Sequence, residues 1–267
     1  MDEYPVQIGS MLFTMVDPHP GYEVAYNRWY ERDHFYAGCM IGPWLFAGGR
    51  WVAPRALKDL RFPEKSPFAE PVDAGSYLST YWIHKDHVEE HLKWAGEQVV
   101  WLYSNGRGFQ ERTHAHTSIY DLVSIKYADE DGVPMELALD HHYPGLGVLV
   151  TEPAEGVSQA DHQAWLEAEA VPSLLATEGV TTWSSWVKHP APADAGPSQS
   201  PMKLGTDGGS ADRLVQLVFI EGDPTVAWKA FQAFGETVDA GPVAKLTFAA
   251  PFFGTNVGTD DYADQLW

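Results

Sequence analysis

Several features on which common protein functions depend are scarce in this chain. It has one cysteine, Cys39, which cannot form a disulfide within the chain, so a reducing cytoplasm is the expected compartment. No apolar run approaches the ~18 residues that a membrane-spanning helix needs. The N-terminus begins with Met1, Asp2 and Glu3, whose charge is opposite to that of a secretory signal. These absences exclude a membrane-spanning protein and predict a cytoplasmic one.

Basic residues are also few. The chain has 17 Lys and Arg against 37 Asp and Glu, which gives a formal net charge of −20. This charge repels phosphate backbones, so we expect no nucleic-acid partner. The acidic residues are spread out, with a short run only at residues 129–131, and we interpret them as maintaining solubility.

Nucleotide-binding and serine-hydrolase motifs are absent. There is no G-x-G-x-x-G after a strand, no G-x4-G-K-[ST] loop and no serine at a nucleophile elbow. What the chain does have is 45% hydrophobic residues, which excludes wholesale disorder, and 11 Trp, 12 Tyr and 12 Phe. So many aromatic side chains indicate either a core of large residues or a ligand cavity lined by rings.

The sequence repeats itself at a spacing of 135–136 residues. The matching pairs are residues 16–18 with 151–153, Trp29 with Trp165, Trp51 with Trp186, and 77–83 with 213–219. One spacing that holds over four blocks indicates an internal duplication. We therefore divide the chain into a first repeat (1–127), a linker (128–143) and a second repeat (144–267).

Each repeat has the same order of elements: strand, helix, strand, long polar loop, strand, helix and strand. The long loops are residues 53–75 and 188–211. In the first repeat, the second helix has an apolar stripe at Val88, Leu92, Ala95, Val99 and Leu102, spaced for one helical face. In the second repeat, residues 158–161 and 223–224 carry helix-start signals.

A βαββαβ unit is the ferredoxin-like arrangement, an antiparallel sheet with two helices on one face. The other face of the sheet needs a partner. The sequence therefore predicts an α+β fold of two tandem ferredoxin-like repeats, packed sheet to sheet in the manner of a dimeric α+β barrel, with a cavity between sheet and helices. A homodimer of the whole chain is compatible with this fold.

The first helix carries the motif Trp29-x4-His34, which is repeated as Trp165-x4-Ala170-x-Pro172. It resembles the W-x4-H-x-P helix of EthD-like proteins in the dimeric α+β barrel superfamily. That superfamily includes cofactor-free monooxygenases, polyketide cyclases, lactone isomerases and haem enzymes such as chlorite dismutases and dye-decolourising peroxidases. The chain departs from the motif twice, because Tyr36 stands in place of the proline and Ala170 in place of the second histidine. The resemblance therefore implies an active first repeat and a scaffolding second repeat.

His34 is the first candidate catalytic residue. An imidazole can take or give a proton near neutral pH, which suits general acid/base catalysis. Helical spacing aligns His34 with Tyr26 and Tyr30, and Trp29 lies close to it. We predict that Tyr30 is a catalytic residue which, together with His114 or His116, orients the substrate or stabilises enolate charge. Tyr26 and Trp29 are expected to contribute to substrate binding.

His114 and His116 alternate on the last strand of the first repeat, so we expect their imidazoles to point to one face. They are candidates for catalytic groups in the cavity. Alternating histidines can also hold a metal, but no further ligands can be assigned, and we predict no metal site.

The connection over residues 38–51 is apolar and rich in glycine, which is typical of a segment that lines a site. Trp44, Phe46 and Trp51 are predicted walls for an apolar substrate, and Arg50 is a candidate to hold a carbonyl or carboxylate. Trp82, on the third strand, is a further candidate for substrate binding.

Residues 87–91 match the H-x-x-E-H pattern of some zinc peptidases. Because they begin the apolar-striped helix, with His87, Glu89 and Glu90 on its solvent flank, we interpret the match as accidental.

The sequence thus predicts an enzyme that binds a small hydrophobic compound, aromatic or polycyclic with a carbonyl group, and moves a proton by histidine chemistry without a cofactor. Lyase, isomerase and cyclase reactions share this first step. The alternatives are a haem enzyme of the same superfamily, a cofactor-free monooxygenase, and a non-catalytic binding protein for an apolar metabolite.

Overall fold

A computed structural model of the chain describes residues 5–190, 203–205 and 208–267. Within them, eight strands pair antiparallel and form a closed barrel in the order β1-β3-β2-β8-β5-β7-β6-β4. The strands are β1 (Ile8–Pro18), β2 (Leu45–Val52), β3 (Tyr77–His84), β4 (Arg112–Tyr127), β5 (Gly145–Pro153), β6 (Val180–Lys188), β7 (Leu214–Ile220) and β8 (Ala244–Gly254).

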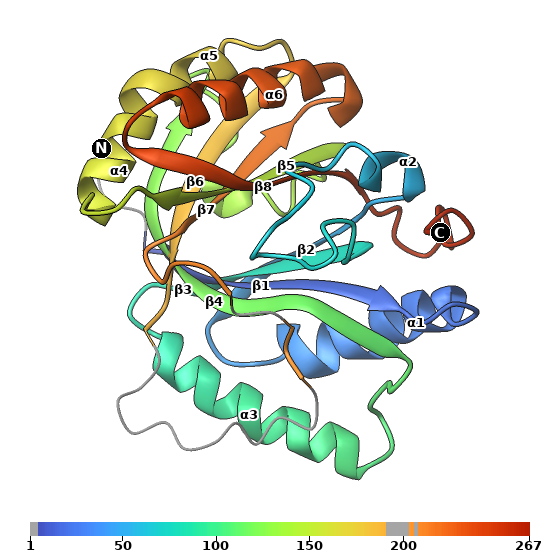
Figure 1. Cartoon of the computed structure of the whole chain (residues 1–267). Coiled ribbons are helices and arrows are strands. Elements are labelled where there is room, and N and C mark those ends of the chain that lie inside the picture. Colours follow the sequence, from blue (N-terminus) through green and yellow to red (C-terminus); the bar gives the residue numbers. More distant parts are fainter. Residues whose placement is uncertain (1–4, 191–202, 206–207) are drawn as a thin grey trace.

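The helices lie outside the barrel, in two groups (Figure 1). They are α1 (Glu23–Trp29), its π-helical continuation η1 (Tyr30–Met40), α2 (Arg55–Lys58), α3 (Val88–Ser104), the 3₁₀ turn η2 (Met135–Leu137), α4 (Gln159–Trp165), its π-helical continuation η3 (Leu166–Ala170), α5 (Val171–Leu175) and α6 (Pro224–Ala240). Figure 1 shows α4, α5 and α6 on one side of the barrel and α1 and α3 on the other. Among the described residues, none of the helices is long and apolar enough to cross a membrane.

The two halves of the barrel have the same topology. The first half has the strand order β4-β1-β3-β2 and the second β8-β5-β7-β6, which is the ferredoxin-like order in each case. α6 begins 136 residues after α3, and in both halves the first helix becomes a π-helix directly after a tryptophan, Trp29 or Trp165. The predicted fold class, two tandem ferredoxin-like repeats packed sheet to sheet, is confirmed.

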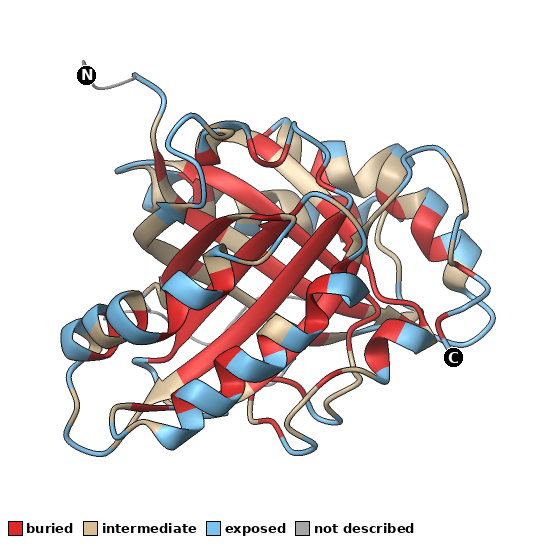
Figure 2. Ribbon diagram, turned by 90° about the horizontal axis from the view of Figure 1, so that it is seen from above, coloured by how far each residue is buried: buried red, intermediate tan, exposed pale blue. Residues whose placement is uncertain are grey.

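Large apolar side chains from both sheets fill the barrel between them, and Figure 2 shows the strands as mostly buried. Trp82 of β3 stacks on Trp186 of β6 with ring centroids 5.1 Å apart. Trp51 of β2 packs edge-on against Phe219 of β7, with centroids 6.3 Å apart. Contacts of this kind join the two repeats through a common core, because each sheet covers the apolar face of the other.

The helix starts in the second repeat follow the sequence signals. The Ser158 side chain accepts a hydrogen bond from the backbone N–H of Asp161, and the Asp223 carboxylate accepts one from the backbone N–H of Thr225. Each bond satisfies a backbone donor that the first turn of a helix leaves unpaired. Pro224 at the first position of α6 has no N–H to satisfy.

The long loops reach across the barrel to the opposite repeat. In the first loop, Phe62 forms a β-bridge with Ala249, and the Leu60 carbonyl accepts a hydrogen bond from the indole N–H of Trp228. In the second loop, residues 191–202 and 206–207 lie outside the described residues, but Gly205 forms a β-bridge with His116. Each repeat therefore contacts the other through its long loop.

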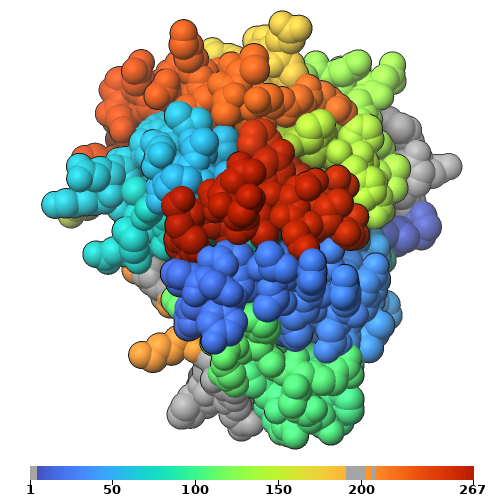
Figure 3. Space-filling model, turned by 90° about the vertical axis from the view of Figure 1, so that its right-hand side faces the viewer, coloured from blue at the N-terminus to red at the C-terminus, as the bar shows by residue number. Residues whose placement is uncertain are grey.

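The segment after β8 packs on the first repeat. Figure 3 shows these C-terminal residues crossing one face of the molecule, between the first loop and the region of α1. Leu266 is fully buried, and its carbonyl accepts a hydrogen bond from the Lys58 ammonium group. Asp260 forms an ion pair with Arg28 of α1 at 2.5 Å. The C-terminus of the second repeat thereby holds the first helix of the other repeat in position.

Candidate active site

The helix–sheet layers of the two repeats are packed differently. In the second repeat, α6 buries seven residues and makes a continuous apolar layer with β5, β7 and β8. Phe231 of α6 lies so close to β5 that a Cβ atom at Gly147 would come within 2.1 Å of its ring. Side chains therefore fill this layer.

In the first repeat, α3 is the same length but buries only His91 and Leu102. Leu92, Ala95 and Val99 of the predicted apolar stripe face a cavity of about 830 Å³ between α3, η1 and the sheet. Phe231, which fills the layer of the second repeat, lies 136 residues after Ala95. The apolar face of α3 therefore covers a hollow large enough for a ligand.

His34 projects from η1 into this cavity. Its imidazole stacks on the Trp29 indole, with centroids 4.5 Å apart and planes inclined by 17°, and Gly38 leaves room for its edge. Neither ring nitrogen has a hydrogen-bond partner among the described residues. Burial, followed by the positive charges of Arg112 and of protonated His114, lowers the pKa of His34 to about 3. The imidazole is therefore neutral at neutral pH, with a nitrogen available to a ligand.

His114 lies in the same cavity in a fixed tautomer. Arg112 donates its Nε–H to His114 Nε2 at 3.3 Å, so the ring proton is on Nδ1, which donates to Thr117 Oγ1 at 2.7 Å. Thr117 is in turn 2.7 Å from the hydroxyl of Thr14. Burial and the Arg112 charge lower the pKa of His114 to about 3. His114 thus serves as a neutral support that orients the Arg112 guanidinium.

Tyr30 lines the cavity beside His34, and its hydroxyl is 2.8 Å from the hydroxyl of Tyr81. Burial raises the pKa of both phenols well above the usual value. Burial also raises the pKa of the neighbouring Cys39 thiol to about 12. These groups keep their protons, so they can donate or relay hydrogen bonds but cannot act as bases.

His91 is a cavity residue that the sequence analysis missed. Its Nδ1 donates to the carbonyl of Pro43 at 3.1 Å. A signal was present, since position 91 is three residues after Val88 and four before Ala95 and therefore shares their helical face. His87, the other histidine of the H-x-x-E-H match, instead stacks on Trp44. No group of three potential metal ligands occurs in the part of the chain that the structure describes.

The prediction that His114 and His116 point to one face is wrong. The register between β1 and β4 shifts at this point, so that Met15 pairs with His116 but Val16 with His114. This β-bulge inserts one residue, Ala115, and sends the two imidazoles to opposite faces. His116 is buried inside the barrel, stacked on Phe68, with its Nε2 2.7 Å from the Tyr120 hydroxyl.

The other predicted site residues are scattered. Trp51 and Trp82 belong to the barrel core, and Phe46 packs at its edge, so they do not line the cavity of His34. For Trp51, Trp82 and Phe46 the cause is strand geometry, since a residue that lines the barrel cannot face the helices. Trp44 is 43% exposed and therefore does not form a wall of a buried site.

Two further predicted residues are buried in the helix layer. Arg50 lies beneath η1, where its guanidinium bonds Asn27 and Glu31 and lies 4.4 Å from the Tyr30 ring centroid. Tyr26 is buried in the α1 layer against Trp29 and Tyr30.

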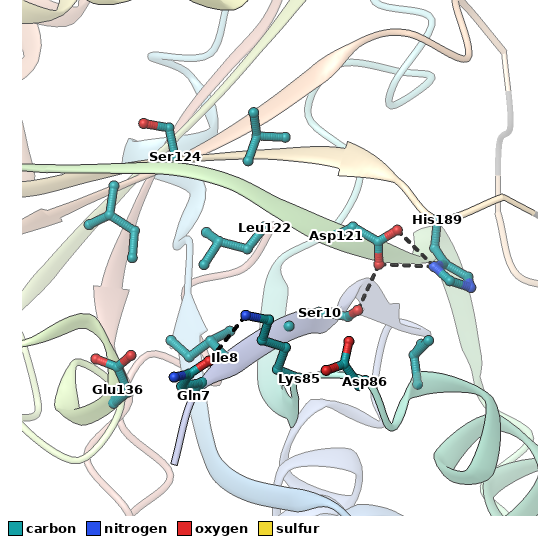
Figure 4. Close-up of a pocket in the computed structure, with 14 residues that line it drawn as sticks. Gln7, Ile8, Ser10, Lys85, Asp86, Asp121, Leu122, Ser124, Glu136 and His189 are labelled. Carbon is teal, nitrogen blue, oxygen red and sulfur yellow. Dashed lines mark hydrogen bonds and ion pairs between the residues drawn. The ribbon is translucent and has the colours of Figure 1, made fainter. Parts of the chain in front are cut away.

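A polar cavity of about 870 Å³ lies elsewhere, between β4 and the ends of β1, β3 and β6 (Figure 4). There, His189 Nδ1 is 2.8 Å from the Asp121 carboxylate, and its Nε2 is 3.3 Å from Glu89. Ser10 donates its hydroxyl proton to Asp121 at 2.6 Å and not to His189. A nucleophilic serine must contact the imidazole, so these three residues do not form a hydrolase triad.

Comparisons with known proteins show the fold. No family model and no curated protein sequence matches the chain. A solved structure provisionally named a chlorite dismutase superposes with a TM-score of 0.51 at 12% identity, over 98% of this chain and 100% of that chain. An anthrone oxidase-like protein (TM-score 0.49, 10% identity, 95% of each chain) and a provisionally named monooxygenase from Fusobacterium nucleatum (0.49, 9%, 95% and 94%) are also similar. The first of these likenesses shows a dimeric α+β barrel fold, and it does not single out the EthD-like proteins.

Proposed function

We propose that the first repeat is an enzyme active site that binds an apolar aromatic compound with an acidic O–H, or an acidic C–H next to a carbonyl. In this proposal His34 takes the proton and dioxygen then oxidises the resulting anion. The observation that carries the proposal is a neutral histidine in an apolar cavity, without a hydrogen-bond partner among the described residues. The corresponding layer of the second repeat has no such cavity, because side chains fill it.

With a pKa of about 3, His34 is neutral at neutral pH, and the neutral imidazole is the form that accepts a proton. The same low pKa makes His34 a weak base in the empty cavity. Burial and the Arg112 charge are its main causes. An oxyanion formed on the substrate opposes both of these effects, because it pairs with the new imidazolium and offsets the charge of Arg112. The basicity of His34 therefore increases as the proton moves.

Arg112 is positioned to stabilise the anion. Its guanidinium lines the cavity, is oriented by His114, and lies 4.5 Å from the centroid of the Trp29 ring that also supports His34. A preoriented cation in a site with few waters stabilises developing negative charge more strongly than water does. The apolar face of α3 then excludes water from the anion.

Oxidation is the reaction class that we favour. Three of the similar structures are named as a dismutase, an oxidase-like protein and a monooxygenase, and these names give no support to a lyase, isomerase or cyclase reaction. In the oxidation that we propose, the substrate anion gives its electrons to dioxygen. Dioxygen forms a C–O bond at the carbon that carries the negative charge, and the resulting peroxide takes the proton back from the His34 imidazolium. The O–O bond then breaks as the same carbon loses its remaining hydrogen as a proton, which leaves a carbonyl on the substrate and releases the other oxygen atom as water.

Haem, the alternative cofactor, does not fit the described residues. An axial histidine needs its Nδ1–H held by an acceptor, and the haem propionates need basic side chains within reach. His91 has the held Nδ1–H, but among the described residues only one basic side chain, Lys93, lines its end of the cavity, and Arg107 and Arg112 lie beyond the other end of α3. His34 is near Arg112 but has no acceptor among the described residues. We therefore derive no step through haem.

The experiment is oxygen uptake in the presence of apolar acids such as anthrone and 1-naphthol. We expect at least one of them to be oxidised by the wild-type protein, and His34→Gln to lower kcat by a factor of about 10²–10⁴, the usual contribution of a general base. His87→Gln is the matched control, because His87 stacks on Trp44 outside the cavity. If His34→Gln retains the wild-type rate, the proposal is wrong.

A further inference from the structure

We infer that His91 selects the substrate at the end of the cavity remote from His34, and that it selects a hydrogen-bond donor such as a hydroxyl group. This inference rests on the proposed function, because it concerns the same cavity. It adds a requirement on the ligand, namely an elongated apolar body with a hydroxyl group at the far end.

Three contacts fix how residues 33–43, which include most of η1, lie along residues 91–107, which include most of α3. Arg107 forms an ion pair with Asp33, Gln98 donates to the Ala37 carbonyl at 2.5 Å, and His91 donates to the Pro43 carbonyl at 3.1 Å. As the numbers rise along one segment they fall along the other, so the two segments are antiparallel.

His34 lies between Asp33 and Ala37, and therefore beside the stretch of chain from residue 98 to residue 107. At a rise of 1.5 Å per residue, the seven residues from His91 to Gln98 alone span about 10 Å of the helix axis. The two imidazoles thus face the same cavity from its two ends. A ligand that reaches both must be elongated.

The Pro43 carbonyl decides what His91 can bind. A carbonyl oxygen only accepts, so the hydrogen bond requires the proton on His91 Nδ1. In the neutral ring Nε2 then has a lone pair and no proton, and it has no hydrogen-bond partner among the described residues. Burial lowers the pKa of His91, which favours this neutral form. A hydroxyl group on the ligand satisfies Nε2, whereas a carbonyl or ether oxygen leaves both atoms without a partner.

Between the two imidazoles the cavity has little that would restrict a flat ring system. Leu92, Ala95 and Val99 form one wall, and Gly96 has no atoms within 4 Å of the position where a Cβ would be. These side chains contact a ligand through dispersion and apolar burial without selecting its polar groups. Lys93 and Glu97 also line the cavity from α3, but both are exposed to solvent, whereas His91 is buried. Polar selection at the buried far end therefore depends on His91.

The test is binding of three rigid probes, measured by calorimetry at a pH that keeps their hydroxyl groups protonated. The probes are 2,6-dihydroxyanthraquinone, 2-hydroxy-6-methoxyanthraquinone and 2-hydroxyanthraquinone, which differ only at the far end. We expect the wild-type protein to bind the dihydroxy compound about tenfold more tightly than the methoxy compound, the upper range for one neutral hydrogen bond. Equal affinities, or no binding of any of the three, would overturn the inference.

The variant His91→Phe should reduce this difference to about twofold or less, because an aromatic ring is kept while the Nε2 acceptor is lost, together with the Nδ1–H bond to the Pro43 carbonyl. His87→Phe makes the same substitution on the solvent flank next to α3 and should leave the tenfold difference intact. If His91→Phe unfolds, His91→Leu with the same probes replaces it, because leucine also has no acceptor. A His91→Phe protein that still prefers the dihydroxy probe tenfold would also overturn the inference.

These binding measurements need no turnover, so the two proposals can fail separately. Selective binding without oxygen uptake contradicts the proposed oxidation and supports the role of His91. Oxygen uptake that depends on His34, without selectivity between the probes, contradicts only the role of His91.

Discussion

His34 stacks face to face on Trp29, with the two ring centroids 4.5 Å apart. The same indole lies 4.5 Å from the Arg112 guanidinium, and its N–H donates to the Arg107 carbonyl at 2.9 Å. One aromatic side chain therefore supports both the base and the cation that we assign to the reaction. The contact also gives a physical meaning to the Trp-x4-His motif, since the turn of η1 brings the two rings together.

Replacing Trp29 with Leu should lower kcat about tenfold and change substrate affinity little, because the substitution frees His34 without removing it. Trp29→Phe keeps an aromatic face and should recover most of the rate. Steady-state kinetics over a range of pH checks this. In the Leu variant, the apparent pKa of the base should also rise as water enters. An unchanged pH profile together with a lower protein stability would indicate a purely structural role for Trp29.

The depressed pKa of His34 predicts an acid sensitivity of folding. In the folded state its pKa is about 3, against about 6.5 in the unfolded chain. Below pH 6.5 the unfolded state therefore binds a proton that the folded state does not, so the free energy of unfolding decreases as the pH is lowered from 6.5 to about 3. Above pH 6.5 the imidazole is neutral in both states, and His34 causes no loss of stability. Besides Arg112 and His114, Arg50 disfavours the protonated form, whereas Asp33 favours it.

At pH 5 this difference for His34 amounts to about 2 kcal/mol. Urea unfolding at pH 7 and pH 5 should show that His34→Gln loses about 2 kcal/mol less between the two pH values than the wild type does. His114 makes a similar contribution in both proteins, since burial and Arg112 also lower its pKa to about 3. Equal losses in the two proteins would mean that His34 is protonated as readily when folded as when unfolded.

The contrast between the two repeats can be tested by exchange. Ala95→Phe places in α3 the side chain that α6 has at Phe231, 136 residues later, and should fill part of the 830 Å³ cavity. We expect ligand affinity to fall at least about tenfold, with the free energy of unfolding unchanged or raised by about 1 kcal/mol.

The reverse change, Phe231→Ala, removes a fully buried ring and should cost about 3–5 kcal/mol of stability while leaving ligand binding intact. Chemical denaturation and calorimetry of both variants provide the comparison. If Ala95→Phe left affinity unchanged, the ligand would have to bind somewhere else.

His116 should behave as a structural residue. It is 1% exposed, stacks on Phe68 with centroids 4.0 Å apart and bonds the Tyr120 hydroxyl. His116→Ala should therefore cost about 2–4 kcal/mol of stability through the cavity it leaves and the lost hydrogen bond, with kcat unchanged at temperatures where the variant is folded. Thermal unfolding and turnover of the same sample check this. A stable variant without activity would assign His116 to the site after all.

Much of the fold was predictable from the sequence, because periodicity and the 136-residue spacing are local or internal signals. The tryptophans of the repeats, the apolar stripe of α3 and the starts of α4 and α6 all depend on nearby residues. The cavity itself was predictable only in outline. Its size depends on the large buried side chains that α6 has and α3 does not, and this difference is seen only when both helices are packed on their sheets.

The structure places His34, Tyr30 and His114 around one cavity, but their catalytic role stays a prediction. The prediction was wrong where the alternation of side chains along a strand decides the face. A single inserted residue, Ala115, reverses the face on which His116 lies, and sequence alternation cannot reveal such a bulge. Trp51 and Trp82 were assigned to the substrate because they are large and aromatic, but the two sheets need the same kind of residue to fill the barrel. Burial against a partner sheet and burial against a ligand leave the same sequence pattern.

The most direct measurement of the central claim is a crystal structure of the protein with 2,6-dihydroxyanthraquinone bound. We predict ring density between α3 and the sheet of the first repeat, with one oxygen within hydrogen-bond distance of His34 and the other near His91. Density in the polar cavity of Figure 4, or between α6 and the sheet of the second repeat, with the cavity of His34 empty, would contradict the claim.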